Sequence, residues 1–410
     1  MLNRRSFNSN MVVGSISALG LSQADLLSAG VGEKDERAVI WVFLQGGCSF
    51  ADTFNPSDSI LDEYKSITGT VDTTIPGIKF AGGLEKLASR MKHLSVIKGF
   101  CHQNSDHSFA THLLQTGINN QQAGQSHPSI GSMISKINGG VNSSGIPIYN
   151  TTSSLEFQDA AWLGAAYSPL NVNSDIKKNF LPTVELNRLR ERASVLAAID
   201  RFQENNPKIR DMNKLKNQAY NVVFGGAKEA FEIEKEPKEL REKYGKGFGE
   251  NLLMARRLAE RGSKYINVSL GNFDLHAGLK DGHTRLNPII DNGLSTLMDD
   301  LQAKGMEKNV LVILTTEFGR TKIVLNPNSD TVGRNHNPRT CPLVMFGGDF
   351  NHGQIIGGTD DKCLEVNNKP SGPPDLAATI FKHFGLQTNI QETNHAGRPI
   401  YLVNNGVSIL

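Results

Sequence analysis

The chain has 410 residues, of which 38% are hydrophobic and 20% charged, and its formal net charge is +2. A near-neutral charge without long basic runs argues against nucleic acid or an anionic membrane surface as the main partner. The length is sufficient for one large α/β domain, or two modest ones, with a well-populated core.

The N-terminal residues have the layout of an export signal. Arg4 and Arg5 form an adjacent pair, and no further charge appears until Asp25. Residues 11–21 are apolar but diluted by Gly and Ser, and they are too few to span a bilayer permanently. An amphipathic helix is the alternative, but this charge-free stretch has no polar face. The pattern predicts a twin-arginine signal peptide over residues 1–30.

Export would place the mature domain, residues 36–410, in the periplasm or outside the cell. The twin-arginine translocase would then be a partner during export, and no permanent membrane anchor is expected. In an oxidising compartment the four cysteines could form one or two disulfides or stay as isolated buried thiols. These cysteines are Cys48, Cys101, Cys341 and Cys363.

From residue 37 onward, short β-branched runs alternate with helical stretches, which is typical of a parallel sheet covered by helices. The clearest strands are almost wholly apolar, as expected when both faces are covered. They span residues 38–44, 94–98, 265–270, 310–314 and 343–346. Apolar spacing predicts helices from Leu286 to Lys304 and from Asp375 to Phe384. The charged segment from about 182 to 261 predicts a helical insertion or cap without a core of its own.

Polar residues cluster just after the predicted strands, where ligands bind in an open parallel sheet. Carboxylates and neutral imidazoles gathered at one edge suit a divalent ion, which we expect to be zinc, manganese, magnesium or calcium. In extended backbone, Asp274 and His276 point to the same side and could hold one ion together. Singly, such residues are often helix caps or hydrogen-bonded histidines. The candidate metal ligands are Asp52, Asp274, His276, Glu317 and His336.

Four motifs in order resemble the twin-arginine-exported "domain of unknown function 1501" family. They lie within residues 46–56, 244–258, 316–321 and 333–338, and the resemblance covers essentially the whole mature chain. That family resembles an outlying branch of the alkaline-phosphatase and sulfatase fold. The resemblance implies a three-layer α/β/α sandwich with a mostly parallel sheet, and metal-assisted hydrolysis of phosphate or sulfate esters.

The resemblance also implies roles for individual residues. Asp274 and His276 resemble the fold's metal-binding pair after the middle strand, and His336 resembles its late metal-binding histidine. The fold's hydrolases place their nucleophile where His107 stands here, with Ser108 beside it. His107 departs from that pattern, so Ser108 or a water held by the metal would attack, and His107 would transfer a proton.

Two further comparisons with the fold's pattern concern the remaining candidates. Glu317 keeps a carboxylate where the hydrolases have Asp-His-Gly, but Phe318 removes the imidazole, which weakens at least one metal site. Asn104, Arg320 and Arg334 are the expected substrate-binding residues, because guanidinium groups can bind an oxyanion bidentately.

The sequence therefore predicts an exported metal-dependent hydrolase acting on a small-molecule or glycan ester of phosphate or sulfate. The alternative is a non-catalytic relative that binds a glycan, a lipid or a partner protein through the same sheet edge. The missing nucleophile favours this alternative.

Overall fold

The computed structural model describes residues 36–119, 127–172, 227–394 and 396–410, together with residues 188, 191, 192, 213, 215, 216 and 220. The predicted signal peptide, residues 1–30, lies outside the described residues, as does most of the predicted insertion before residue 227. Among the residues described, no helix combines the length and apolar character that crossing a membrane requires.

An eight-stranded sheet forms the centre of the described chain, in the order β12-β4-β11-β8-β1-β7-β5-β6. Neighbouring strands are parallel except at β11, which is antiparallel to both β4 and β8. The predicted mostly parallel sheet is confirmed. The strands are β1 (Ala38–Leu44), β4 (Ser95–Ile97), β5 (Tyr149–Thr151), β6 (Leu170–Asn171), β7 (Tyr265–Leu270), β8 (Val310–Thr315), β11 (Leu343–Gly347) and β12 (Gln354–Ile356).

The reversal of β11 follows from the hairpin that precedes it. After β8 the chain forms β9 (Gly319–Leu325) and β10 (Val332–Asn337), which pair antiparallel. This hairpin brings the chain back to the edge it has just left, so that Leu343, which begins β11, pairs with Thr315 at the end of β8. The hairpin is therefore held at the carboxyl edge of β8.

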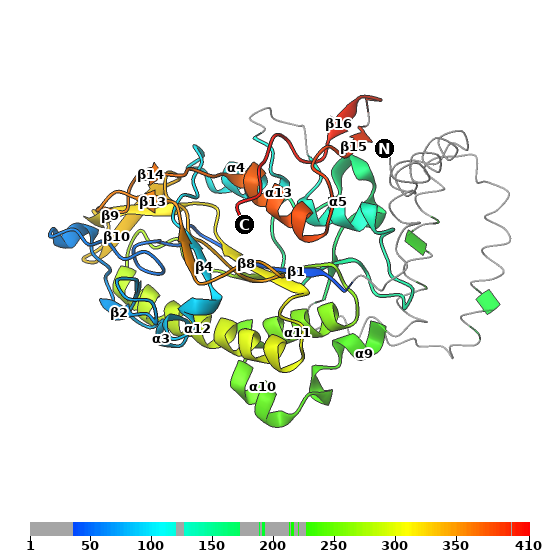
Figure 1. The fold of residues 1–410 in the computed structure, drawn as a ribbon, viewed down its shortest axis with the longest axis horizontal. Helices are drawn as coiled ribbons and strands as arrows, with labels where there is room; N and C mark the ends of the chain where they lie inside the picture. Colours follow the sequence, from blue (N-terminus) through cyan, green and yellow to red (C-terminus); the bar gives the residue numbers. More distant parts are fainter. Residues whose placement is uncertain are drawn as a thin grey trace, which may run out of the picture.

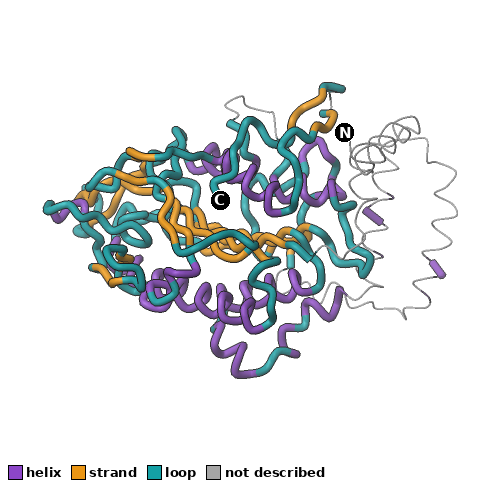
Figure 2. Tube along the Cα trace, in the orientation of Figure 1, coloured by secondary structure: helices purple, strands orange, loops and turns teal. Residues whose placement is uncertain are grey.

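Helices cover both faces of the sheet, which makes the three-layer α/β/α sandwich expected from the sequence (Figures 1 and 2). One layer holds α3 (Glu85–Ala88), α9 (Ala227–Phe231), α10 (Lys238–Tyr244), α11 (Phe248–Glu260) and α12 (Leu279–Ala303). The other holds α4 (His107–Thr116), α5 (Ile130–Ile137) and α13 (Pro373–His383). α11, which lies within the predicted insertion, packs on α12 and β7.

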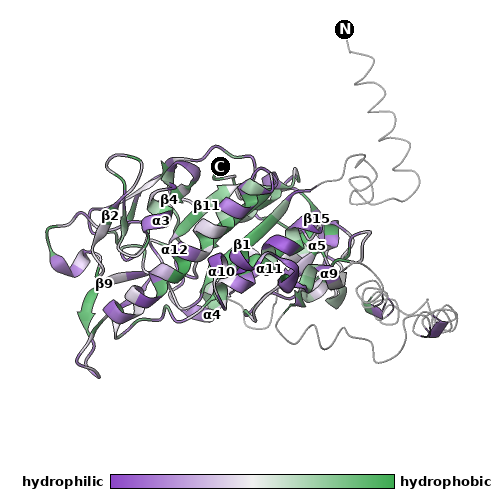
Figure 3. Ribbon diagram, turned by 90° about the horizontal axis from the view of Figure 1, so that it is seen from below, coloured by the Kyte–Doolittle hydropathy of each residue, from purple (hydrophilic) through white to green (hydrophobic). Residues whose placement is uncertain are grey.

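The side chains of β1 alternate between two hydrophobic cores, as the pleat of a doubly covered strand requires. Ile40 and Val42 belong to the core beneath α11 and α12. Val39, Trp41 and Phe43 belong to the core beneath α4, α5 and α13. The central strands are accordingly coloured hydrophobic in Figure 3, whereas α10 is largely hydrophilic.

Two helix starts depend on proline or glycine. α12 begins at Leu279, earlier than the predicted Leu286, after Gly278 in a left-handed conformation, and it accommodates Pro288 in its interior. α13 begins with Pro373, where the missing N–H costs no helical hydrogen bond. Its Asp375 carboxylate accepts a hydrogen bond from the backbone N–H of Gly372 (2.8 Å).

Smaller elements surround the sandwich. Three further strand pairs are β2 (Thr70–Asp72) with β3 (Lys79–Ala81), β13 (Gly358–Thr359) with β14 (Val366–Asn368), and β15 (Gln391–Thr393) with β16 (Pro399–Tyr401). Short 3-10 turns span Asp62–Tyr64, Met91–His93, Ala161–Leu163, Ala165–Tyr167 and Ile233–Lys235. All four cysteines are free thiols, and burial raises the pKa of Cys363 to about 12.

Candidate metal centre

Three histidines and one aspartate meet at the carboxyl edge of the sheet. The Asp274 Oδ1 atom lies 3.0 Å from His276 Nε2 and 3.4 Å from His336 Nε2. Its Oδ2 atom lies 3.6 Å from His107 Nε2. The Nε2 atoms of His276 and His336 are 3.0 Å apart. We call these four residues the histidine cluster.

Each member reaches the cluster from a segment that ends or begins an element there. His107 is the first residue of α4, whose N-cap Asp106 accepts a hydrogen bond from the backbone N–H of Phe109. Asp274 and His276 follow β7, and His336 lies on β10 opposite Arg320 of β9. The i, i+2 pair expected from the sequence does face one site.

The opposite nitrogen of each imidazole is bound to an oxygen acceptor. His107 Nδ1 donates to the Glu317 carboxylate (2.8 Å), and His336 Nδ1 donates to the backbone carbonyl of Ser105 (2.7 Å). His276 Nδ1 lies 3.3 Å from the side-chain oxygen of Asn335. Because these nitrogens carry the hydrogens, the neutral rings turn Nε2 lone pairs toward one another and toward Asp274.

Convergent lone pairs and a carboxylate repel one another unless a proton or a cation lies between them. Zinc bonds to nitrogen and oxygen of about 2.1 Å in a tetrahedron place ligand atoms about 3.4 Å apart, close to the separations found here. His107, Asp274 and His336 each offer a ligand atom within 4.8 Å of the others. These three residues can therefore share one divalent ion once their ligand atoms move closer together, and His276, which is not one of the three, contacts Asp274 and His336.

Glu317 anchors the cluster to the sheet. Its side chain is only 3% exposed and accepts hydrogen bonds from the backbone N–H of Gly46 (2.7 Å) and the hydroxyl of Thr316 (2.9 Å), besides that from His107. Its backbone carbonyl accepts from His102 Nε2 (2.6 Å). Predicted as a metal ligand, Glu317 touches the cluster through the His107 ring, in the way that carboxylates orient metal-binding histidines.

Arg320 holds the Asp274 carboxylate in place. The guanidinium group is buried, with Nη2 2.5 Å from Asp274 Oδ1 and Nη1 3.4 Å from His276 Nε2. It also donates to backbone carbonyls, among them those of Gly47 (Nε, 2.6 Å) and Arg334 (Nη1, 2.9 Å). Its donors are thus committed within the protein, contrary to the predicted substrate-binding role. Burial alone would raise the pKa of Asp274, but Arg320 lowers it, so this carboxylate stays ionised.

The imidazole pKa values differ within the cluster. The hydrogen bond to Glu317 raises the pKa of His107. Burial lowers the pKa of His336, and the charge of Arg320 lowers it further. His336 is therefore neutral, as a metal ligand must be, at a pH where His107 can still take up a proton.

Asp52 and Arg334 are not part of the cluster. Asp52 is fully buried and pairs with Arg334, whose Nε lies 2.7 Å from Asp52 Oδ2. The Asp52 carboxylate also accepts from the backbone N–H of Ile67 (2.8 Å) and lies 3.8 Å from His283. Arg334 is 1% exposed, so neither the predicted metal ligand nor the predicted oxyanion-binding group is presented to the site.

Ser108 and Asn104 lie at the rim. The Ser108 hydroxyl donates to the exposed carboxylate of Glu156 (2.9 Å). The Asn104 side chain is 3.4 Å from that of Asn119, and its backbone N–H donates to His102. Among the described residues, neither side chain forms a hydrogen bond with the histidine cluster.

The sequence did not reveal the residues that orient the cluster. His102 follows β4, and Asn335 is next to the predicted ligand His336. These positions were the sequence signals that could have identified the two residues. The carbonyl of Ser105 carries no such signal, because any residue supplies one. The sequence assigned His107 to catalysis, and the structure brings it among the candidate metal ligands.

Comparison with known proteins matches the chain to one family. A model of the family described as "Protein of unknown function (DUF1501)" matches residues 36–410. No curated protein matches the sequence.

Several solved structures are similar over most of the chain. The PsFucS1 sulfatase from Pseudoalteromonas sp. has 12% identity and a TM-score of 0.44, over 94% of this chain and 75% of that one. The alkaline phosphatase from the Antarctic bacterium TAB5 has 14% identity and a TM-score of 0.36, over 87% and 99%. The lipoteichoic acid synthase LtaP from Listeria monocytogenes has 11% identity and a TM-score of 0.35, over 92% and 76%.

Proposed function

The chain belongs to the family described as "Protein of unknown function (DUF1501)", and from its site we propose that it is an exported metal-dependent hydrolase of a phosphate or sulfate ester. The observation that carries the proposal is the convergence of three imidazole Nε2 atoms on the Asp274 carboxylate. The ester class comes from the family resemblance of the sequence motifs, and the export route comes from the Arg4-Arg5 leader.

In this proposal His107, Asp274, His276 and His336 hold one ion. Three imidazoles with one carboxylate favour zinc over magnesium or calcium, which prefer oxygen ligands. When bound, the ion polarises the ester oxygen and lowers the pKa of a water. Glu317 keeps the His107 proton on Nδ1, and Arg320 offsets the charge of Asp274. His107 is then a ligand instead of the proton-transfer group.

A second function is favoured by the absence of a nucleophilic side chain in the cluster. Ser108 is bound to Glu156, and the guanidinium groups of Arg320 and Arg334 are held by protein acceptors. A non-catalytic protein that binds a glycan, a lipid or a partner protein at this edge would need neither a nucleophilic hydroxyl nor free guanidinium groups. The two functions differ in whether bound metal is accompanied by turnover.

The test measures metal content and ester hydrolysis on the purified mature protein. We expect about one zinc per chain in the native protein and hydrolysis of nitrophenyl phosphate or nitrophenyl sulfate. The double variant His276→Ala/His336→Ala should lose both. His93→Ala, which changes an exposed histidine just before the first residue of β4, away from the carboxyl edge that holds the cluster, should keep both. Absence of both stoichiometric metal and turnover would end the hydrolase proposal, and metal without turnover would favour the binding function.

A further inference from the structure

A second site candidate lies at the edge of the sheet opposite the histidine cluster. A cavity of about 920 Å³ opens there, within the size range of small-molecule sites. Its lining includes Arg37, just before β1, and Lys308, just before β8. It also includes Gly348 and Asp349, directly after the antiparallel β11. These positions place the cavity at the amino ends of the parallel strands.

The cavity lining is cationic. Four side chains with a full positive charge line the cavity, together with one acidic side chain, that of Asp349, and the main-chain oxygen of Leu410. Lys382 is engaged, since its Nζ donates to the backbone oxygen of Leu410 (2.5 Å). Lys308 and Lys369 are exposed, and their ammonium groups form no ion pair or hydrogen bond with any residue that the structure describes. The cations are Arg37, Lys308, Lys369 and Lys382.

A turn of left-handed backbone adds hydrogen-bond donors to these charges. Gly347, Gly348 and Asp349 have φ angles of 75°, 75° and 58°. The N–H of Gly348 donates to the carbonyl of Glu307 (2.9 Å). The backbone N–H groups of Asp349 and Phe350 have no acceptor within the described part of the chain. Unpartnered N–H groups in such turns form concavities that bind anions.

We propose that this cavity binds a ligand carrying phosphate or sulfate groups, held by Lys308, Lys369 and the N–H groups of the 348–350 turn. The two ammonium groups supply charge, and the backbone donors supply direction, so a multiply charged oxyanion fits better than a single carboxylate. This site is separate from the histidine cluster and does not depend on hydrolysis there.

Isothermal titration calorimetry of the whole chain tests the proposal, with inorganic pyrophosphate and sulfate as separate probes at constant ionic strength. We expect one of the two anions to bind the native protein. The Lys308→Gln/Lys369→Gln variant should bind it about tenfold more weakly, because two of the charges that attract the anion are removed. A matched variant, Lys79→Gln/Lys246→Gln, removes two exposed lysines elsewhere and should bind as the native chain does.

The variant His336→Ala separates this site from the proposed metal centre. Its affinity for the anion should equal that of the native chain, whatever the metal content. The proposal is overturned by equal binding in the Lys308/Lys369 variant, by an equal loss in the matched variant, by loss of binding in His336→Ala, or by absence of binding of both anions.

Discussion

At the scale of single residues, the hydrogen bonds of Glu317 make a sharp prediction. Its carboxylate accepts from three donors, the N–H of Gly46, the Thr316 hydroxyl and His107 Nδ1. Glu317→Gln keeps the shape but sets an NH₂ group against one of these donors. We expect a 10- to 100-fold loss of zinc affinity, typical of lost orienting partners. Chelator competition measures this loss.

The control for this prediction is Glu156→Gln, which removes an exposed carboxylate beside Ser108 and should leave the zinc affinity unchanged. Equal affinity of Glu317→Gln and the native chain would show that the orientation of His107 does not depend on Glu317.

Asp52 provides a second residue-scale prediction. As the buried partner of Arg334 it would affect stability, whereas as a metal ligand it would affect zinc content. Asp52→Asn leaves the buried Arg334 without a charged partner, which should cost about 3–5 kcal/mol in the free energy of unfolding and leave the zinc content unchanged. Urea unfolding and metal analysis measure the two quantities. Asp62→Asn, in an exposed pair with Lys65, should change stability little. If Asp52→Asn instead lost zinc and kept the free energy of unfolding of the native chain, Asp52 would be a metal ligand.

The sequence predicted these residues unevenly for a physical reason. Asp274 and His276 follow from local pattern, since polar residues beyond parallel strands share an edge, whereas His336 was recognised from the family resemblance. The pairing of Asp52 with Arg334 joins positions 282 apart in the chain, and no local pattern encodes which distant carboxylate a guanidinium group will meet. Burial of both charges is visible only once the loops are placed.

At the scale of elements, apolar patterning located strands but not their direction. The run that becomes β11 is apolar because both faces are covered, and this holds for parallel and antiparallel strands alike. Its reversal depends on the β9–β10 hairpin, whose strands carry Arg320 and His336. The sheet and its helices could thus be predicted, whereas the hairpin that completes the site could not.

The turn at Gly46, directly after β1, packs against the backbone that carries Asp274, so the site is sensitive to substitution there. Gly46 has a φ of 106°, and a Cβ atom there would lie 2.5 Å from the backbone nitrogen of Asp274. Gly46→Ala should therefore cost several kcal/mol and weaken zinc binding. Gly305 also has a positive φ, of 64°, but open space around an added carbon, so Gly305→Ala should cost about 1–2 kcal/mol.

Urea unfolding of the two glycine variants separates backbone strain from the steric clash. If Gly46→Ala lowered the free energy of unfolding no more than Gly305→Ala does, the turn could move away from Asp274 without consequence. A Gly46→Ala chain that does not accumulate as folded protein, beside a Gly305→Ala chain that does, would agree with the prediction.

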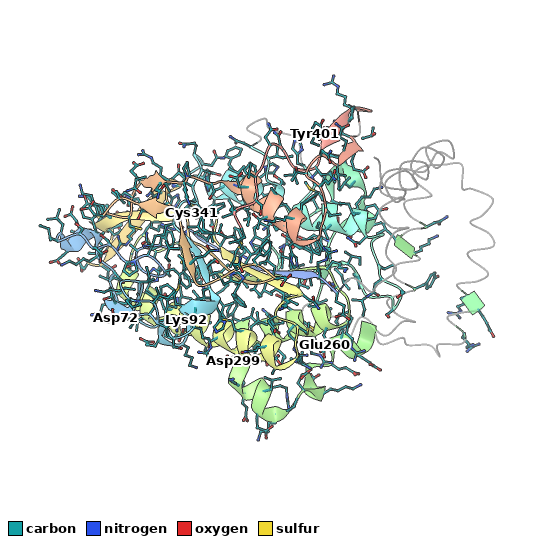
Figure 4. All side chains as sticks on the ribbon, in the orientation of Figure 1. Asp72, Lys92, Glu260, Asp299, Cys341 and Tyr401 are labelled. Carbon is teal, nitrogen blue, oxygen red and sulfur yellow. The ribbon has the colours of Figure 1, made fainter. Side chains whose placement is uncertain are left out.

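At the scale of the whole molecule, buried ion pairs tie the helical layer together. Arg256 of α11 is fully buried and contacts Glu236 (2.9 Å), Glu260 and Asp300 (2.8 Å). Glu260 and Asp299 lie on this helical side of the sheet (Figure 4). Because α11 and α12 contribute many residues to the core on this face, loss of these charges should weaken the packing of the whole helical layer.

The last prediction follows from the pKa of Glu236. Burial alone would raise this pKa, but Arg256 and Arg257 lower it below the ordinary value of 4.5. The folded state then binds fewer protons than the unfolded state below about pH 4.5, so the stabilisation is complete above that pH and is lost as the pH falls through the lowered pKa. Glu236→Gln should destabilise the chain at pH 7, and its deficit should shrink in acid. Urea midpoints at pH 7, 5 and 3.5 measure this, with exposed Glu239→Gln as control. A deficit that stays constant with pH would mean that the Glu236 carboxylate contributes by packing and not by charge.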